Sequence, residues 1–313
     1  MQADRETYIP YPNLPLWPAE YHAPRLVPAL LLLLTSVSML VVGARLQYNF
    51  NRLRPPFRTF NDVFPFLWAW HHPGLLMQGL PFCSTLLLIL LAHEMGHYLA
   101  CRQYGMAASL PYFLPAPTLL GTLGAFIRIH SPFPHRRALL DVGIAGPLAG
   151  FVVAVPYFWL GLRQSVLKPF PTNASGMAFG WPAVAHAILW VAHPGMAAGQ
   201  IYLSPVARAA WFGFMATMLN LIPAGQLDGG HILYALAPRL HRWTSWLLAP
   251  ALVWAGWRYW QGWYIWAGFI LLMRGQHPGV PRGEDLGPLR LSLALAGAII
   301  LALTMVLAPV RLV

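Results

Sequence analysis

The feature that most constrains this chain is a series of apolar runs, most of them 17 residues or longer, separated by segments that carry arginine. An apolar helix of about 20 residues is long enough to cross the hydrocarbon core of a bilayer. Hydrophobic residues make up 58% of the 313 residues and charged residues 9%, whereas soluble domains contain about 25% charged residues. This composition excludes an ordinary soluble enzyme and a disordered chain, so we expect a protein embedded in a membrane.

The runs predict an all-α polytopic membrane protein with six transmembrane helices, and with seven or eight as alternatives. The six spans are expected at residues 26–42, 81–102, 137–162, 205–222, 243–260 and 289–307. The run at 264–273 is too short to span a bilayer alone. Residues 61–70 are rich in aromatic side chains, which favour the membrane interface. We therefore expect a polar N-terminal segment, 1–25, followed by one membrane-embedded domain, 26–313.

The connection between the second and third spans breaks the helical pattern. Pro111, Pro115 and Pro117 exclude a straight helix there. Residues 121–129 then combine glycine with β-branched and aromatic residues, which favour strands. The sequence therefore predicts a small membrane-associated β-hairpin, and a short helix near residues 182–191 in the next connection.

The charge is strongly basic, with a formal net charge of +11. All but one of the 20 basic residues are arginine, and they are scattered between the apolar runs. This distribution is typical of the flanks of membrane spans, so no nucleic-acid partner is expected. The high ratio of arginine to lysine resembles a GC-rich bacterial genome and predicts a multi-pass protein of a bacterial inner membrane.

Three of the nine acidic residues, Glu94, Asp141 and Asp228, fall in or against apolar runs. A carboxylate at that depth is costly and marks a functional site by default. His93 and His97 are four residues apart, so on a helix both rings lie on one face and can bind one metal ion. Glu94 can reach a water on that ion, which is the HExxH pattern of zinc proteases. Asp141 is expected to be only a charge at a helix start.

A catalytic zinc site takes a third protein ligand and keeps one position for water. Asp228 is the best candidate, because Pro223 ends the fourth span and Gly225, Gly229 and Gly230 allow the chain to turn back. The alternative is that Asp228 caps the following helix, and the two roles are compatible.

His93-Glu94-Met95-Gly96-His97 followed by Leu227-Asp228-Gly229 resembles the site-2 protease family of intramembrane zinc metalloproteases. Asn220 and Pro223 fit that family's second signature, and residues 145–150 resemble the small-residue stretch of its middle core helix. Residues 115–126 are similar to the segment before that helix in bacterial and plastid members. The match covers about residues 80–235, the expected catalytic core.

The resemblance implies that His93, His97 and Asp228 hold one Zn²⁺ per chain and that Glu94 activates its water. It also implies that the substrate is a membrane-spanning protein cut in or near the bilayer, as in regulated intramembrane proteolysis.

Two further groups of residues are candidates for a role in catalysis. Asn220 and His231 are candidate oxyanion donors or partners of the zinc ligands. Their alternatives are helix-to-helix hydrogen bonding for Asn220 and an ordinary helix-start residue for His231. An exposed strand edge can hold an extended substrate by strand addition, and the alternative is a purely structural hairpin. The residues of that edge are Gly121, Thr122, Leu123 and Gly124.

Two other functions compete with an intramembrane endopeptidase. One is a membrane zinc peptidase that acts on soluble or lipidated peptides in a chamber, against which the Leu227-Asp228-Gly229 signature argues. The other is a catalytically silent relative or a metal-transporting membrane protein, and the presence of Glu94 argues against it.

Overall fold

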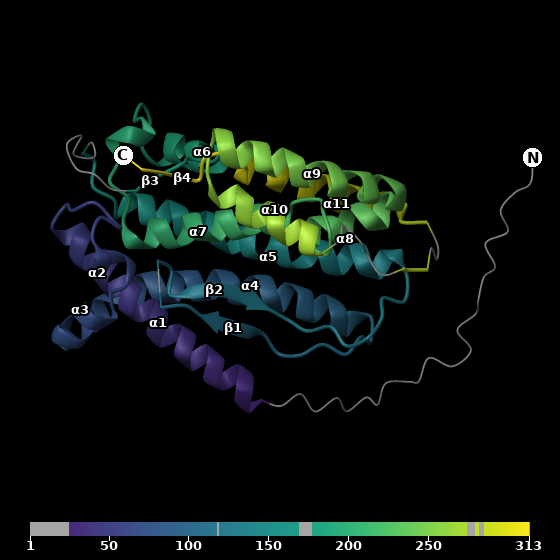
Figure 1. Cartoon of the computed structure of the whole chain (residues 1–313), viewed down its shortest axis with the longest axis horizontal. Coiled ribbons are helices and arrows are strands. Elements are labelled where there is room, and N and C mark those ends of the chain that lie inside the picture. Colours follow the sequence, from purple (N-terminus) through teal and green to yellow (C-terminus); the bar gives the residue numbers. More distant parts are fainter. Residues whose placement is uncertain (1–24, 118, 169–176, 274–278, 282–284, 313) are drawn as a thin grey trace, which may run out of the picture.

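The computed structural model describes residues 25–117, 119–168, 177–273, 279–281 and 285–312. Of the polar segment predicted at 1–25, all but Arg25 lies outside these residues. The described part is a bundle of helices with two small antiparallel sheets (Figure 1). The mostly helical architecture predicted from the apolar runs is confirmed.

Within the described residues, four helices are long and apolar enough to cross a membrane. They are α1 (Leu26–Asn51), the run of η1 (Pro73–Gly79) and α4 (Leu80–Gln103), α5 (Arg136–Arg163) and α11 (Gly287–Thr304). The other two predicted spans fall on α7 (Pro205–Asn220), which has only 16 residues, and on α9 (Pro238–Arg258), which carries three arginines. The predicted count of six spans is therefore not confirmed.

The remaining helices are short. They are α2 (Phe60–Val63), α3 (Phe66–His71), α6 (Ala183–Ala192), η2 (Ala198–Gln200), α8 (Asp228–Leu236) and α10 (Gly262–Leu272). The short helix predicted near residues 182–191 is confirmed as α6.

An ion pair attaches α2 to α1. Arg45 Nε donates to Asp62 Oδ1 over 2.7 Å, and Asn49 Nδ2 donates to the same oxygen over 2.7 Å. Burial raises the pKa of Asp62, but the hydrogen bonds from Asn49, Thr59 and Arg45 outweigh burial and hold this pKa below its usual value. The pair thus fixes the aromatic-rich segment that contains α2 and α3 against the end of α1.

The predicted hairpin is confirmed between the second and third long helices. Strand β1 (Tyr112–Pro115) pairs antiparallel with β2 (Thr122–Phe126), and Tyr112 lies opposite Phe126. At the turn, Gly121 has φ +76°, and a Cβ there would lie 2.5 Å from Met39 Cα of α1. Only glycine allows the turn to pack this closely.

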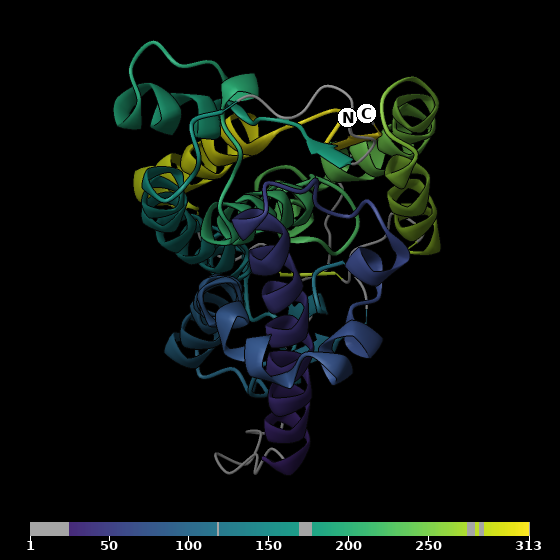
Figure 2. The same cartoon turned by 90° about the vertical axis from the view of Figure 1, so that its left-hand side faces the viewer.

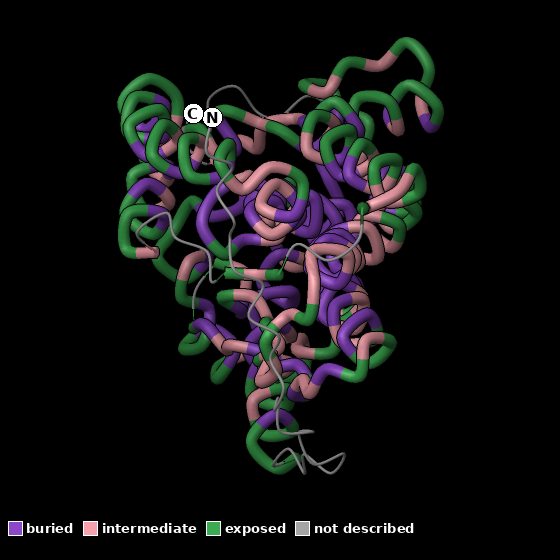
Figure 3. Tube along the Cα trace, turned by 90° about the vertical axis from the view of Figure 1, so that its right-hand side faces the viewer, coloured by how far each residue is buried: buried purple, intermediate pink, exposed green. Residues whose placement is uncertain are grey.

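A second sheet joins segments that are far apart in the sequence. Strand β3 (Met177–Phe179) pairs antiparallel with β4 (Val310–Leu312). Helix α7 packs against α4 and α5 in the middle of the bundle, and Figure 2 shows α11 (yellow) and α9 (lime) well apart, at the upper left and upper right. Buried residues concentrate at this centre, and the exposed ones lie at the periphery (Figure 3). The core therefore holds α4, α5 and α7 side by side.

Candidate metal centre

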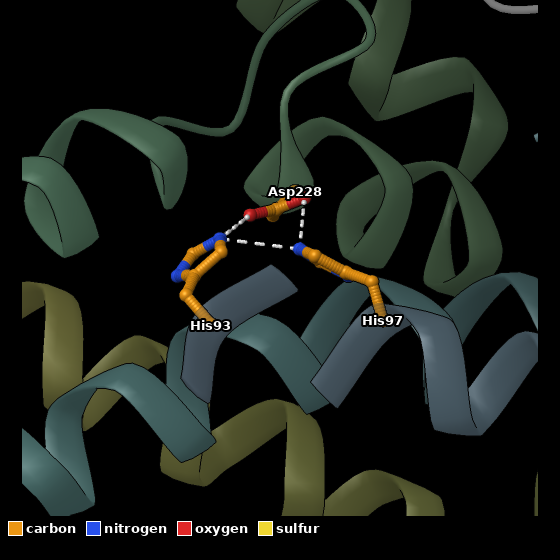
Figure 4. A group of neighbouring side chains, drawn as sticks. All are labelled: His93, His97 and Asp228. Carbon is orange, nitrogen blue, oxygen red and sulfur yellow. Dashed lines mark hydrogen bonds and ion pairs between the residues drawn. The ribbon is translucent and has the colours of Figure 1, made fainter. Parts of the chain in front are cut away.

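Two histidines of α4 and an aspartate at the start of α8 converge on one point (Figure 4). The Nε2 atoms of His93 and His97 are 3.1 Å apart. Asp228 places Oδ2 3.2 Å from His93 Nε2 and Oδ1 3.3 Å from His97 Nε2. His93 and Asp228 are 135 positions apart in sequence, so only the fold brings them together.

The spacing of these atoms fits a tetrahedral metal ion. Donor atoms about 2.0–2.1 Å from a zinc ion at tetrahedral angles lie about 3.3–3.4 Å from one another. The three measured separations are 3.1, 3.2 and 3.3 Å. Two imidazole nitrogens and one carboxylate are also ligands that zinc prefers, and they leave the fourth position for water. In the part of the chain that the structure describes, this is the one group of three or more such side chains placed to share an ion.

Tight turns aim Asp228 at the two rings. Helix α7 ends at Asn220, and α8 begins at Asp228. A Cβ on Gly229 would lie 2.0 Å from Leu221 O, so the two ends of this turn touch. Both carboxylate oxygens of Asp228 face histidines. This orientation favours the ligand role over simple capping of α8.

A hydrogen bond sets the orientation of the His97 ring. His97 Nδ1 lies 2.7 Å from Val142 O of α5, so Nδ1 carries the proton and donates to this carbonyl. The lone pair of Nε2 is then directed at the other two ligand atoms. Such a partner fixes the tautomer and raises the basicity of a metal ligand.

Helix α5 approaches the two rings through glycines. A Cβ on Gly146 would lie 2.1 Å from His97 Nε2, and one on Gly150 would lie 3.2 Å from His93 Nδ1. On the α4 side of the same contact, a Cβ on Gly96 would lie 2.4 Å from Ala145 O of α5. The small residues of the stretch at 145–150 therefore let α5 pack closely against α4.

Glu94 is buried beside the rings, with 5% of its surface exposed. Its carboxylate lies close enough to His93, His97 and Asp228 to interact with them electrostatically. The backbone N–H of Ile127, the residue after β2, lies near this carboxylate and interacts favourably with its charge. The hairpin therefore reaches the acidic residue of the HExxH motif, a link that the sequence alone does not reveal.

The two further polar candidates lie in different places. Asn220 Nδ2 is 3.2 Å from His93 Nε2, at the metal-facing edge of that ring. His231, three residues after Asp228, packs against Phe133 with ring centroids 5.7 Å apart. A Cβ added to Gly143 of α5 would lie 3.0 Å from the Cβ of His231. Asn220 is thus at the centre, whereas these contacts of His231 lie on the packing face of α8.

The candidate docking residues lie along β2 and its turn. Thr122 is buried, and its hydroxyl donates to Leu114 O over 2.9 Å. Leu123 is 76% exposed. Gly124 has φ +109°, and a Cβ there would meet no atom within 4 Å. In the described residues β2 pairs only with β1, so its other edge has no strand partner.

Asp141 differs from the expectation. Because α5 begins at Arg136, Asp141 lies in the second turn, so the prediction of a helix-start charge is wrong. Its Oδ2 instead accepts hydrogen bonds from Tyr104 and Arg290. Arg290 follows Asp141 by 149 residues, and no local pattern could have shown this contact.

Comparison with known proteins bears on this site. Residues 81–245 match the model of Peptidase family M50. The chain is 33% identical over 170 residues to "Probable zinc metalloprotease EGY2, chloroplastic" of Arabidopsis thaliana, covering 54% of this chain and 30% of that protein. It is 33% identical over 186 residues to "Probable zinc metalloprotease EGY1, chloroplastic" of the same plant, covering 58% of this chain and 32% of that protein. The chain thus spans about a third of the length of these relatives.

Proposed function

The chain belongs to peptidase family M50, and from this premise we propose that it is an intramembrane zinc endopeptidase. It would hydrolyse peptide bonds in or near the transmembrane segments of other membrane proteins. The observation that carries this proposal is the convergence of His93, His97 and Asp228 at tetrahedral spacing, with Glu94 beside them on a helix long enough to cross a membrane. Site-2 proteases of this family act on such substrates.

We assign the roles as follows. His93, His97 and Asp228 hold one zinc ion per chain. Bound zinc would lower the pKa of a coordinated water toward about 7 and polarise the scissile carbonyl. The Glu94 carboxylate takes the proton of the attacking water and passes it to the leaving amine. Burial of Glu94 excludes other water from this proton transfer.

Asn220 is the better placed of the two further donors. Its amide Nδ2 lies 3.2 Å from a ligand nitrogen, so a small rotation can direct the N–H at the developing oxyanion. The role of His231 as a donor stays a prediction, since the contacts described above lie on the packing side of α8.

The substrate must be extended before it is cut, because a helix hides its peptide bonds. We propose that the free edge of β2, with Gly121, Thr122, Leu123 and Gly124, binds the extended segment by strand addition. The contact between Ile127 and Glu94 supports this proposal. Ile127 directly follows β2, so a segment paired with β2 would lie close to the Glu94 carboxylate, the proposed proton acceptor.

The cellular membrane is a separate question. The relatives are named as chloroplastic proteins, so they give no support to the bacterial inner membrane expected from the arginine content. The four apolar helices support the coarser statement that the protein lies in a membrane.

The Glu94→Gln variant tests the proposed activity. The full chain is reconstituted in liposomes with a panel of single-span reporter proteins, and cleavage products are located by mass spectrometry. Since the amide cannot accept a proton, we expect cleavage by the variant to be about 10²–10⁴-fold slower. The zinc content should stay at one ion per chain, because Glu94 is not a ligand.

Two outcomes would contradict the proposal. Equal cleavage by both proteins would remove Glu94 from the mechanism. Zinc bound by both proteins, with no reporter cut by either, would favour the silent or metal-transporting alternative.

A further inference from the structure

A polar network joins three helices near one end of the bundle. Tyr104, which follows α4, donates its hydroxyl hydrogen to Asp141 Oδ2 of α5. Arg290 of α11 donates to the same oxygen, from Nη2 over 2.8 Å and from Nε over 3.1 Å. Its Nη2 also lies 3.1 Å from the Tyr104 hydroxyl. Each of the three residues therefore contacts the other two.

Arg290 is unusual in its own helix. It is the single charged residue of α11, in a run that is apolar enough to cross a membrane. The Arg290 and Asp141 side chains are 23% and 21% exposed, so the pair is screened by solvent only in part. A charge in such a helix is costly unless it is paired, and removing one partner leaves the other uncompensated. The Arg290–Asp141 pair therefore holds α11 against α5.

The Arg290–Asp141 pair lies next to the metal centre. Asp141 immediately precedes Val142, whose carbonyl accepts the hydrogen bond of His97 Nδ1. Tyr104 lies seven residues after His97, beyond the end of the same helix. The network thus ties together the end of the helix that supplies His97 and the turn of α5 that orients its ring. Its third member comes from α11, which lies outside the residues matched by the family model.

We propose that Arg290 is a positioning residue for the zinc site. By holding Asp141 and Tyr104, it fixes the register of α5 against α4, and this register keeps Val142 O within reach of His97 Nδ1. The inference rests on the proposed function, since it assumes that His97 is a zinc ligand. Arg290 touches neither ligand, so its effect passes through the α5 backbone.

The Arg290→Met variant tests this proposal through zinc release. The purified full chain is loaded with zinc, and the rate of release to an excess of chelator is measured together with the melting temperature. Loss of an outer partner of a metal ligand weakens binding about 10–100-fold. Arg290 does not contact a ligand's partner directly but holds Asp141, the residue before Val142. We therefore expect zinc release to be about tenfold faster, which is the lower end of that range. Arg290→Lys, which keeps the charge, should restore most of the retention.

Arg45→Met is the matched control. It also breaks a buried arginine–aspartate pair, whose Nε–Oδ1 distance is 2.7 Å, but that pair joins α1 to α2 and includes no residue of α4 or α5. We expect it to lower the melting temperature and to leave zinc release unchanged. Where Arg290→Met yields no folded protein, Tyr104→Phe is measured instead, and it should accelerate release to a smaller extent.

The outcomes separate this inference from the proposed function. Release at the wild-type rate in folded Arg290→Met, or in Tyr104→Phe where it replaces that variant, would overturn the positioning role. Release that rises in both Arg290→Met and Arg45→Met, in proportion to the lost melting temperature, would show only a general contribution to stability and would also overturn it. A wild-type chain that binds no zinc would instead remove the zinc site itself.

Discussion

At the scale of single residues, the centre depends on how closely backbone can approach the ligand rings. His97 is held between the carbonyl of Val142 on one side and Gly146 on the other. The carbonyl fixes which nitrogen carries the proton, and the glycine leaves the space that the ring fills. Both residues are on α5, so the ring's position depends on this helix as much as on α4.

Gly146→Ala should therefore disrupt the site. The added methyl group would lie 2.1 Å from His97 Nε2, closer than any real contact, so either the ring or the whole of α5 must move. We expect the zinc content to fall well below one ion per chain. Gly268→Ala is the matched control, because it is also helical and its Cβ would meet no atom within 4 Å. Full zinc content in Gly146→Ala would show that the packing of α5 does not position the ligand.

The sequence reveals the ligand types but not everything that surrounds them. The spacing of His93 and His97 and the glycines around Asp228 are local patterns, so these three residues can be proposed from the sequence. The contact of Val142 O with His97 joins residues 45 positions apart, and it is a backbone contact that any residue type could make. The contact of Ile127 N–H with Glu94 is of the same kind. No residue pattern encodes such contacts.

At the scale of elements, the hairpin bridges α1 and α4, the helix that carries the HExxH motif. Its turn packs on α1 at Gly121, and its far end reaches Glu94 through Ile127. The prolines and the β-branched content revealed this hairpin because both are local signals. The pairing of β3 with β4 could not be predicted, since each strand has three residues and they are more than 130 positions apart.

Gly124→Pro tests the docking role of β2. Proline fixes φ near −65°, about 170° away from the +109° of Gly124, and it removes the N–H that donates to the Thr122 hydroxyl. We expect slower cleavage of a single-span reporter with unchanged zinc content. Gly195→Pro imposes similar strain at φ +82° in a loop outside the hairpin and should cleave at the wild-type rate. Equal cleavage by Gly124→Pro and wild type would count against strand docking.

At the scale of the whole molecule, length and hydropathy predict the four long apolar helices well, whereas α7 and α9 are not confirmed as spans. α7 has only 16 residues, and 12 of them are buried by neighbouring elements. α9 is long, but it begins with two arginines in its first five residues. Hydropathy alone cannot separate a helix buried by protein from one that crosses a membrane.

The proposed zinc site is tested most directly by elemental analysis and zinc X-ray absorption on the purified full chain, beside His97→Ala and Asp228→Ala. We predict one zinc per wild-type chain, with nitrogen and oxygen ligands at about 2.0–2.2 Å, and loss of most of the zinc in both variants. Zinc content that stays at the wild-type level in both variants, or a sulfur ligand at about 2.3 Å, would contradict the site.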